Sequence, residues 1–179
     1  MARLVWPIRP VPRGILTMRC WRVRALSALV VLVSACGTAR FAPTSVCGPQ
    51  EGVVTRVLDG DTIELDDGTT IRYLHVDTPE IARYESEEDE CFALEAKRLN
   101  EELVLGQTVR LEYDMNCTDA YARTLAFVIA RDRMVNRILI ERGYGELLIM
   151  KPNLSREAEF IALEKQARDN NAGLWGACQ

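Results

Sequence analysis

The 179-residue chain lacks the excess of positive charge that usually accompanies binding of a polyanion. It has 22 Lys and Arg residues against 26 Asp and Glu residues. Six arginines and no acid precede residue 36, so the remainder has 22 − 6 = 16 basic and 26 acidic residues, a net charge of −10. Overall charge would not attract a nucleic acid, and any such function must depend on a local site.

The chain also lacks the run of about 20 apolar residues that a membrane-spanning helix needs. The apolar run at 25–35 has 11 residues and follows scattered arginines, which is typical of a signal-peptide core. The run ends in Val33-Ser-Ala-Cys36, which resembles a bacterial lipobox. That resemblance implies cleavage before Cys36 and lipid attachment to it, and Gly37 is typical of outer-membrane sorting. The alternatives are an ordinary signal peptide or a short anchor with an incidental cysteine.

These features predict three parts: a lipoprotein signal peptide at 1–36, a tether at 37–51 and a folded domain at 52–179. The stretch before the apolar run is long for a signal peptide, and Met18 begins a more typical leader. Met18 is therefore a candidate for the true start. We expect an exported, membrane-anchored lipoprotein in the outer membrane and periplasm or at the cell surface.

Zinc-binding patterns are missing as well. The chain has no Cys-x-x-Cys motif and a single histidine, His75, so a zinc site is not expected. Outside the leader, four cysteines remain: Cys47, Cys91, Cys117 and Cys178. In an exported domain an even number suggests two disulfides, with three connectivities open. Free, buried cysteines are the alternative.

The pattern of apolar residues predicts a small α+β domain without internal repeats. Strands are expected at 53–58, 62–65, 69–76, 108–113 and 124–130, with an Asp-Gly hairpin turn at 66–68. A helix is expected from the apolar spacing of Phe92, Ala96, Leu99 and Leu103, and two more at 135–142 and 157–169. Five antiparallel strands interrupted by a helix fit a closed Greek-key β-barrel of the OB type, here with three α-helices.

Four acids lie at the ends of the expected strands: Asp59, Asp61, Asp77 and Glu80. Clustered carboxylates repel one another unless a cation joins them, and oxygen ligands suit calcium or magnesium. Aspartate is also common in turns, so Asp59-Gly-Asp61 alone reads more readily as a turn than as a metal site.

The surrounding motifs change that balance. Three segments are Asp59-Gly-Asp-Thr62, Arg72-Tyr-Leu-His-Val-Asp-Thr-Pro-Glu80 and Asp119-Ala-Tyr-Ala-Arg-Thr-Leu-Ala126. In order and spacing they resemble the staphylococcal nuclease (thermonuclease) family. Three shorter segments also agree with the pattern of this family: Val135-Asn136, Lys151-Pro-Asn153 and Gly173-Leu-Trp175. The resemblance covers about Gly52 to Trp175, and it implies a nuclease on an OB-type barrel.

The resemblance implies a role for each matching residue. Ca²⁺ would be bound by Asp61, Asp77 and the Thr78 carbonyl, with Asp59 in a supporting place near the metal. Glu80 would activate the attacking water. The scissile phosphate would be bound by Arg72 and Arg123, with Tyr121 beside it. Cleavage builds negative charge on phosphoryl oxygens, which a cation and two guanidinium forks stabilise. The implied reaction is in-line hydrolysis of DNA or RNA at the 5′-oxygen, leaving 3′-phosphate.

The chain departs from the family at several positions. A basic residue is usual where Ala120 stands and a glycine where Ala122 stands, and tyrosines that can stack a base are replaced by Leu147-Leu-Ile-Met150. Each lost stacking contact is worth about 1–3 kcal/mol. With the negative net charge, we expect weaker substrate binding than in a basic family member.

Less specific interpretations stay open. Arg72 could pair with Glu64 or another cross-strand acid, Arg123 could neutralise Asp119, and Glu80 could be a plain loop acid. His75 is expected to be structural, on the barrel wall. The whole domain could be a binding module that has lost its chemistry, or a structural lipoprotein domain. Neither explains why all the acids and arginines of the motif are present.

The family fold also suggests how the cysteines pair. It places the start of the first strand near the end of the fourth, which favours Cys47–Cys117 and leaves Cys91–Cys178. It implies that the Lys151–Pro152 bond can be cis, as in the type member. No protein partner is evident from the sequence, and a monomer is expected.

Overall fold

The structure is a computed structural model that describes residues 46–82, 84 and 86–178. The expected signal peptide, Cys36 and most of the tether lie outside these residues. Within the described part, no helix combines the length and apolar character needed to cross a membrane.

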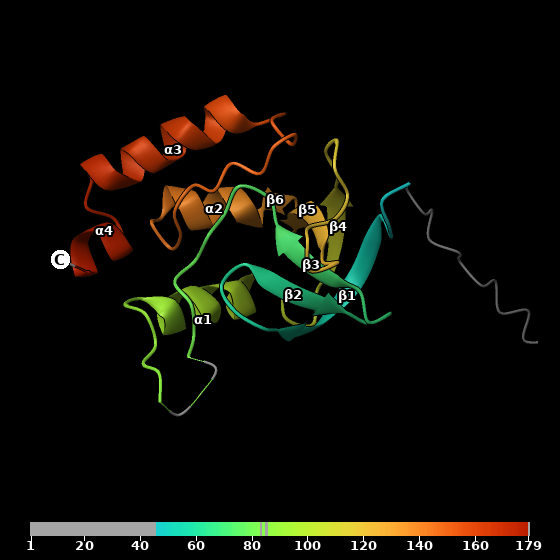
Figure 1. Ribbon diagram of the computed structural model, residues 1–179, viewed down its shortest axis with the longest axis horizontal. Helices are drawn as coiled ribbons and strands as arrows, with labels where there is room; N and C mark the ends of the chain where they lie inside the picture. The colour runs from blue at the N-terminus through green and yellow to red at the C-terminus, as the bar shows by residue number, and fades with distance from the viewer. Residues whose placement is uncertain (1–45, 83, 85, 179) are drawn as a thin grey trace, which may run out of the picture. The chain divides into compact units, whose positions relative to one another are not determined.

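Five strands close into a barrel, as the sequence predicts. They are β1 (Glu51–Val57), β2 (Thr62–Leu65), β3 (Thr70–Tyr73), β4 (Thr108–Glu112) and β5 (Thr124–Ala130). The order along the sheet is β3-β2-β1-β4-β5, and pairing of β3 with β5 closes it (Figure 1). That closing pair is parallel, so the expectation of an all-antiparallel barrel was wrong. A two-residue strand, β6 (Arg133–Met134), extends the sheet beyond β5.

Local sequence explains the strands well. The turn between β2 and β3 contains Gly68, whose φ of 84° suits glycine. All seven residues of β5 are buried, because this strand lies between β4 and β3 and is covered by a helix. Its near-continuous apolar sequence, Thr124–Ala130, is what a strand buried on both faces requires.

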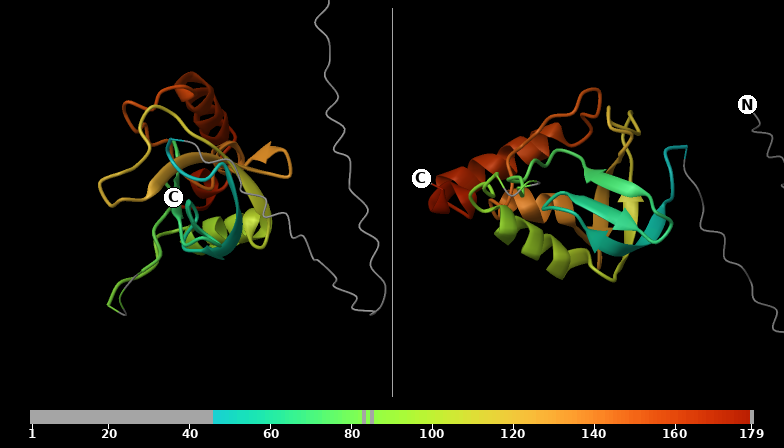
Figure 2. Two further views of the ribbon diagram at one scale, coloured as in Figure 1. Left: turned by 90° about the vertical axis from the view of Figure 1, so that its right-hand side faces the viewer. Right: turned by 60° about the horizontal axis from the view of Figure 1, so that its bottom comes forward.

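Helices cover the barrel on one side of the sheet and at its end. They are α1 (Ala93–Val104), α2 (Val135–Glu141), α3 (Glu157–Asp169) and a short α4 (Leu174–Ala177). Helix α2 packs against β5, α1 and α3, and Figure 2 shows α1 and α3 on opposite sides of it. The α+β class is thus confirmed. The short α4 was not predicted, and the buried face of α1 begins with Ala93, because Phe92 precedes the helix.

The third strand is shorter than the predicted 69–76. It ends at Tyr73, and the chain turns at His75, whose φ is 62°. Asn136 holds this turn: its amide nitrogen donates to Leu74 O at 2.9 Å, and its amide oxygen accepts from Val128 N at 2.8 Å. The side chain of a helix residue thus satisfies backbone groups that a longer strand would have paired.

His75 itself is fully buried, between the rings of Phe127 and Phe160, with centroids 5.5 and 5.4 Å away. Burial lowers its pKa, while the Leu148 backbone and nearby carboxylates oppose that change. Neither ring nitrogen has a partner at normal hydrogen-bond distance in the described part. This histidine packs in the core, as the sequence led us to expect.

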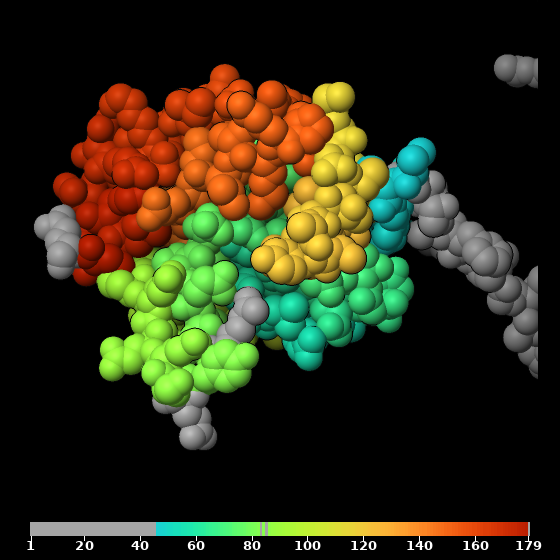
Figure 3. All heavy atoms as spheres, in the orientation of Figure 1, coloured from blue at the N-terminus to red at the C-terminus, as the bar shows by residue number. Residues whose placement is uncertain are grey.

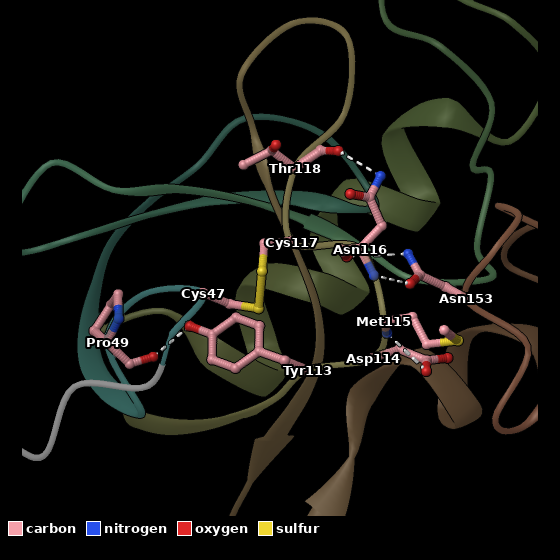
Figure 4. Close-up of a disulfide and its surroundings, with 9 residues drawn as sticks. All are labelled: Cys47, Pro49, Tyr113, Asp114, Met115, Asn116, Cys117, Thr118 and Asn153. Carbon is pink, nitrogen blue, oxygen red and sulfur yellow. Dashed lines mark hydrogen bonds between the residues drawn. A yellow bond between two sulfur atoms is a disulfide. The ribbon is translucent and has the colours of Figure 1, made fainter.

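Two disulfides join distant segments. Cys47 pairs with Cys117 and Cys91 with Cys178, which is the pairing that the family resemblance implied. Figure 4 shows the first, with Asn116 beside it in a reciprocal pair of hydrogen bonds to Asn153. The neighbouring Lys151–Pro152 bond is cis.

Candidate active site

The turn between β1 and β2 presents two acids in different environments. Asp59 Oδ1 accepts the backbone N–H of Asp61 at 3.1 Å, which shapes the turn. Gly60 is required between them, because an added Cβ would lie 2.6 Å from Thr78 Oγ1. The turn therefore packs directly against the segment that follows β3.

Asp61 is buried, with only 4% of its surface exposed. Its Oδ2 accepts from the backbone N–H of Thr78 at 2.9 Å and its hydroxyl at 3.2 Å, and its Oδ1 accepts from the Thr62 hydroxyl at 3.0 Å. Burial raises the pKa of Asp61 to about 7; the Arg72 guanidinium opposes this rise and the Asp59 carboxylate adds to it. A carboxylate with so high a pKa is one that a cation would stabilise strongly.

Arg72 joins two of the acids. Its Nε lies 3.1 Å from Asp61 Oδ1, and its Nη2 donates to Asp77 Oδ1 at 2.7 Å. Its Nη1 donates to the carbonyls of Tyr73, at 3.1 Å, and Val76. The side chain is 5% exposed. The open interpretation of a surface arginine paired with Glu64 is therefore wrong.

A pocket of about 710 Å³ lies next to this network. Thr62 joins the two, because it holds Asp61 and also lines the pocket. Figure 3 shows the yellow loop after β4 beside the green segment after β3, on the face toward the viewer. The full lining is Leu58, Asp59, Thr62, Glu80, Ile81, Ala82, Tyr121 and Arg123. The structure thus brings Asp59, Glu80, Tyr121 and Arg123 together on one surface.

Arg123 is held on the pocket wall by Asp119. Its Nε donates to Asp119 Oδ2 at 2.7 Å, while Asp119 Oδ1 accepts the N–H groups of Tyr121 and Arg123, both at 2.9 Å. Burial alone would raise the pKa of Asp119, but these hydrogen bonds hold it below its ordinary value. The ion pair with Asp119 was an open interpretation of Arg123, and it exists. This ion pair involves Nε of Arg123, a residue that also lines the pocket.

The loop between Asp119 and Arg123 is tight. Ala122, where family members usually have glycine, has a φ of 61°, so an alanine adopts a conformation that glycine enters more easily. Tyr121 is 82% exposed, and its ring lies 5.5 Å from the Arg123 guanidinium carbon. An exposed ring next to a cation at a pocket rim is well placed to contact a ligand phosphate or base.

Glu80 enters the pocket from a segment with no regular secondary structure. The carboxylate is exposed, and its backbone is paired on both sides to Glu90: Glu80 N donates to Glu90 Oε2 at 2.8 Å, and Glu90 N donates to Glu80 O at 3.0 Å. Glu80 is therefore positioned by the acidic loop that precedes α1.

The residues expected to hold a cation supply only oxygen ligands. Asp61 is buried, Asp77 has a half-exposed side chain, and Thr78 adjoins Asp77 in the chain. Two carboxylates on one guanidinium, with a backbone carbonyl nearby, are the donor types that Ca²⁺ prefers. Across residues 46–82, 84 and 86–178, no three His, Cys, Asp or Glu side chains gather as a metal cluster. A cation here would thus need backbone and water ligands as well.

Sequence reasoning gave no role to three residues of the site. Thr62 stood in a quoted motif without a function, Asp119 was considered only as a neutralising partner, and Glu90 lies outside the quoted motifs. Asp119 had a usable signal, since an aspartate that opens a short loop often caps the amides after it. The other two contacts depend on tertiary packing.

Comparison with known proteins agrees with this geometry. The family model described as "Staphylococcal nuclease homologue" matches residues 70–177. The thermonuclease of Staphylococcus hyicus is 32% identical over 84% of this chain and 92% of its own length, and that of Staphylococcus intermedius is 32% identical over 83% and 91%. Endonuclease YncB of Bacillus subtilis is 31% identical over 67% of this chain and 59% of its own. The chain therefore belongs to the staphylococcal nuclease family.

Proposed function

We propose that this chain is a calcium-dependent phosphodiesterase that cleaves DNA, RNA or both within the strand. The family assignment makes it a nuclease, and its relatives carry the names thermonuclease and endonuclease. The observation that carries the finer proposal is the pocket that joins Glu80 and Arg123, beside the buried pair of Asp61 and Arg72.

The cation would be held by Asp61, Asp77 and the carbonyl of Thr78. Bound calcium would stabilise the negative charge that develops on the phosphoryl oxygens during cleavage. The chain prepares this site by burying Asp61, whose ionised form is costly without a cation. Arg72 contacts both carboxylates and fixes their relative positions.

The two arginines differ in how they can reach a phosphate. Arg123 lines the pocket and is paired to Asp119 through Nε, so its Nη groups could donate to phosphoryl oxygens in a bidentate manner. Arg72 is mostly committed inside the protein: its Nη1 donates to two carbonyls, its Nη2 donates to Asp77, and its Nε forms an ion pair with Asp61. Its Nη2, which donates once to Asp77, has a second N–H that could meet the substrate.

Glu80 would take a proton from the attacking water, a role that typically contributes about 10²–10⁴-fold to the rate. The water would attack phosphorus in line with the departing 5′-oxygen, so that the products carry 3′-phosphates. Tyr121, at the rim, would lie beside the bound nucleotide. The net charge of −10 for residues 37–179 opposes binding of a polyanion, so we expect a high KM.

We also propose that the enzyme works as a monomer, exported and anchored to the membrane through lipid on Cys36. This rests on the lipobox-like sequence and the apolar run before it. Replacing Cys36 with serine should move the protein from the membrane fraction to a soluble exported fraction. An unchanged distribution would argue for an ordinary signal peptide or a different anchor.

The proposal is tested by incubating the purified full chain with single-stranded DNA and RNA, in calcium and in chelator. We expect cleavage only with calcium, and product 3′ ends that accept extension only after phosphatase treatment. Arg123→Lys keeps a positive charge near Asp119 but loses the fork, and should reduce kcat/KM by about 10²-fold. Folded protein that cleaves neither polymer over a range of calcium concentration and pH would contradict the proposal.

A further inference from the structure

The segment between Glu80 and helix α1 carries four consecutive acids at residues 87–90, yet it lies beside a pocket for a polyanion. These acids are Glu87, Glu88, Asp89 and Glu90. Three of them, Glu87, Glu88 and Glu90, line a second hollow together with Glu80. Such charge opposes substrate binding. Its presence calls for a structural explanation.

The hydrogen bonds supply that explanation. Glu80 N donates to Glu90 Oε2 at 2.8 Å, and Glu90 N donates back to Glu80 O at 3.0 Å, which closes a ring between the two residues. Ala82 N donates to Asp89 Oδ1 at 2.9 Å and forms a second link. Two acids of the loop therefore accept backbone N–H groups from the segment that carries the proposed general base.

Glu80 needs such support because no helix or strand holds it. Residues 78–82 have no regular secondary structure, and the segment has no neighbouring strand to pair its amides. A loss of position of about 1 Å at a catalytic group can reduce the rate by about 10²-fold. Side-chain acceptors that fix the backbone at 80 and 82 would limit that motion.

The two links, from Glu80 N to Glu90 and from Ala82 N to Asp89, form a clamp on the Glu80 segment. This clamp is attached to rigid parts of the fold. Glu90 O accepts the N–H of Ala93, the first residue of α1, at 3.0 Å. The next residue, Cys91, forms the disulfide with Cys178 after α4. Glu90 is thus fixed to a helix and, through the disulfide, to the C-terminal segment.

We propose that Glu90, assisted by Asp89, is a positioning residue that orients Glu80 by accepting its backbone N–H. The inference rests on the proposed function of Glu80 as general base. It assigns Glu90 a role as a hydrogen-bond acceptor, for which its charge is dispensable. A glutamine at 90 keeps an acceptor oxygen, whereas an alanine removes it.

The test compares Glu90→Gln, Glu90→Ala and a matched control, Glu88→Ala, in the full chain. The control removes one acid from the same loop at a position without a hydrogen bond to the Glu80 segment in the described part. We expect Glu90→Ala to lower kcat at least tenfold with KM changed less than threefold, while Glu90→Gln and the control keep kcat within about twofold of wild type.

A second readout does not depend on activity. Amide hydrogen exchange at Glu80, followed by NMR, should be at least about tenfold faster in Glu90→Ala than in wild type, and unchanged in Glu90→Gln and the control. If wild type cleaves no substrate, exchange still tests the clamp, and the failure belongs to the proposed function. Equal kcat values in Glu90→Ala and the control, or equal exchange at Glu80, would overturn the inference.

Discussion

Asp61 provides a quantitative prediction, because its burial links stability to pH in the metal-free protein. The pKa of its carboxyl rises from 3.8 in an exposed chain to about 7 in the fold. Between these values the folded state binds a proton that the unfolded state has released. Stability from this group is therefore fully present below about pH 4 and is lost as the pH rises through 7.

The size of the effect follows from the shift. About three pH units at 1.36 kcal/mol each correspond to roughly 4 kcal/mol. Protonated Asp61 and asparagine have similar shapes and no charge, so Asp61→Asn should be more stable than wild type by only about 1 kcal/mol near pH 4.5. Near pH 8 the variant should be more stable than wild type, by an amount approaching 4 kcal/mol.

The assay is urea unfolding of both proteins in chelator, from pH 4.5 to 8. Other titrating groups cancel in the difference between variant and wild type. Asp59→Asn is a useful companion, because the Asp59 carboxylate helps to raise the pKa of Asp61, and its removal should shift the wild-type transition to lower pH. A difference between Asp61→Asn and wild type that stays within about 1 kcal/mol over the whole range would refute the reasoning, since Arg72 would then fully compensate burial.

Three further predictions concern stability, each measured by urea unfolding. Asn136→Ala should cost about 2–4 kcal/mol, because it leaves buried backbone groups of β5 and the β3 turn unpaired; a cost below 1 kcal/mol would show that water replaces the amide. Gly143→Ala should lower the free energy of unfolding by at least about 2 kcal/mol more than Gly106→Ala. Both glycines have φ near 70°, but only at Gly143 would the new Cβ meet a backbone oxygen, at 2.1 Å. Equal losses of stability in the two variants would contradict this. Replacing Cys91 and Cys178 with serine should lower the free energy of unfolding by about 2–5 kcal/mol, because the disulfide closes a loop of 87 residues. An unchanged urea midpoint would show that the disulfide constrains the unfolded chain little.

Much of the fold could be predicted because its signals are local. Helix α3 has the predicted bounds, and the Asp-Gly turn lies where the β2–β3 hairpin needs it. The error at β3 has a nonlocal cause. The apolar sequence continues through Val76, but the chain turns at His75, where Asn136 from a helix about 60 residues later satisfies the backbone. No pattern within the strand contains that information.

The site divides in the same way. Motif spacing identified Asp61, Arg72, Asp77 and Glu80 as members of one site, and the structure joins the first three in one network. The spacing did not indicate that Arg72 would be buried, with most of its donors used inside the protein. Nor did it show Glu90 bound to the backbone of Glu80, because the two residues are ten positions apart and no sequence pattern links them.

We propose that Glu80 activates water in a calcium-dependent cleavage. The most direct test is the single-turnover rate of DNA cleavage by the full chain at saturating calcium, for wild type and Glu80→Gln, with binding of the same oligonucleotide measured separately. We expect a rate at least about 10²-fold lower in the variant, with binding changed by less than threefold. A variant that cleaves at the wild-type rate would contradict the assignment of Glu80 as the base.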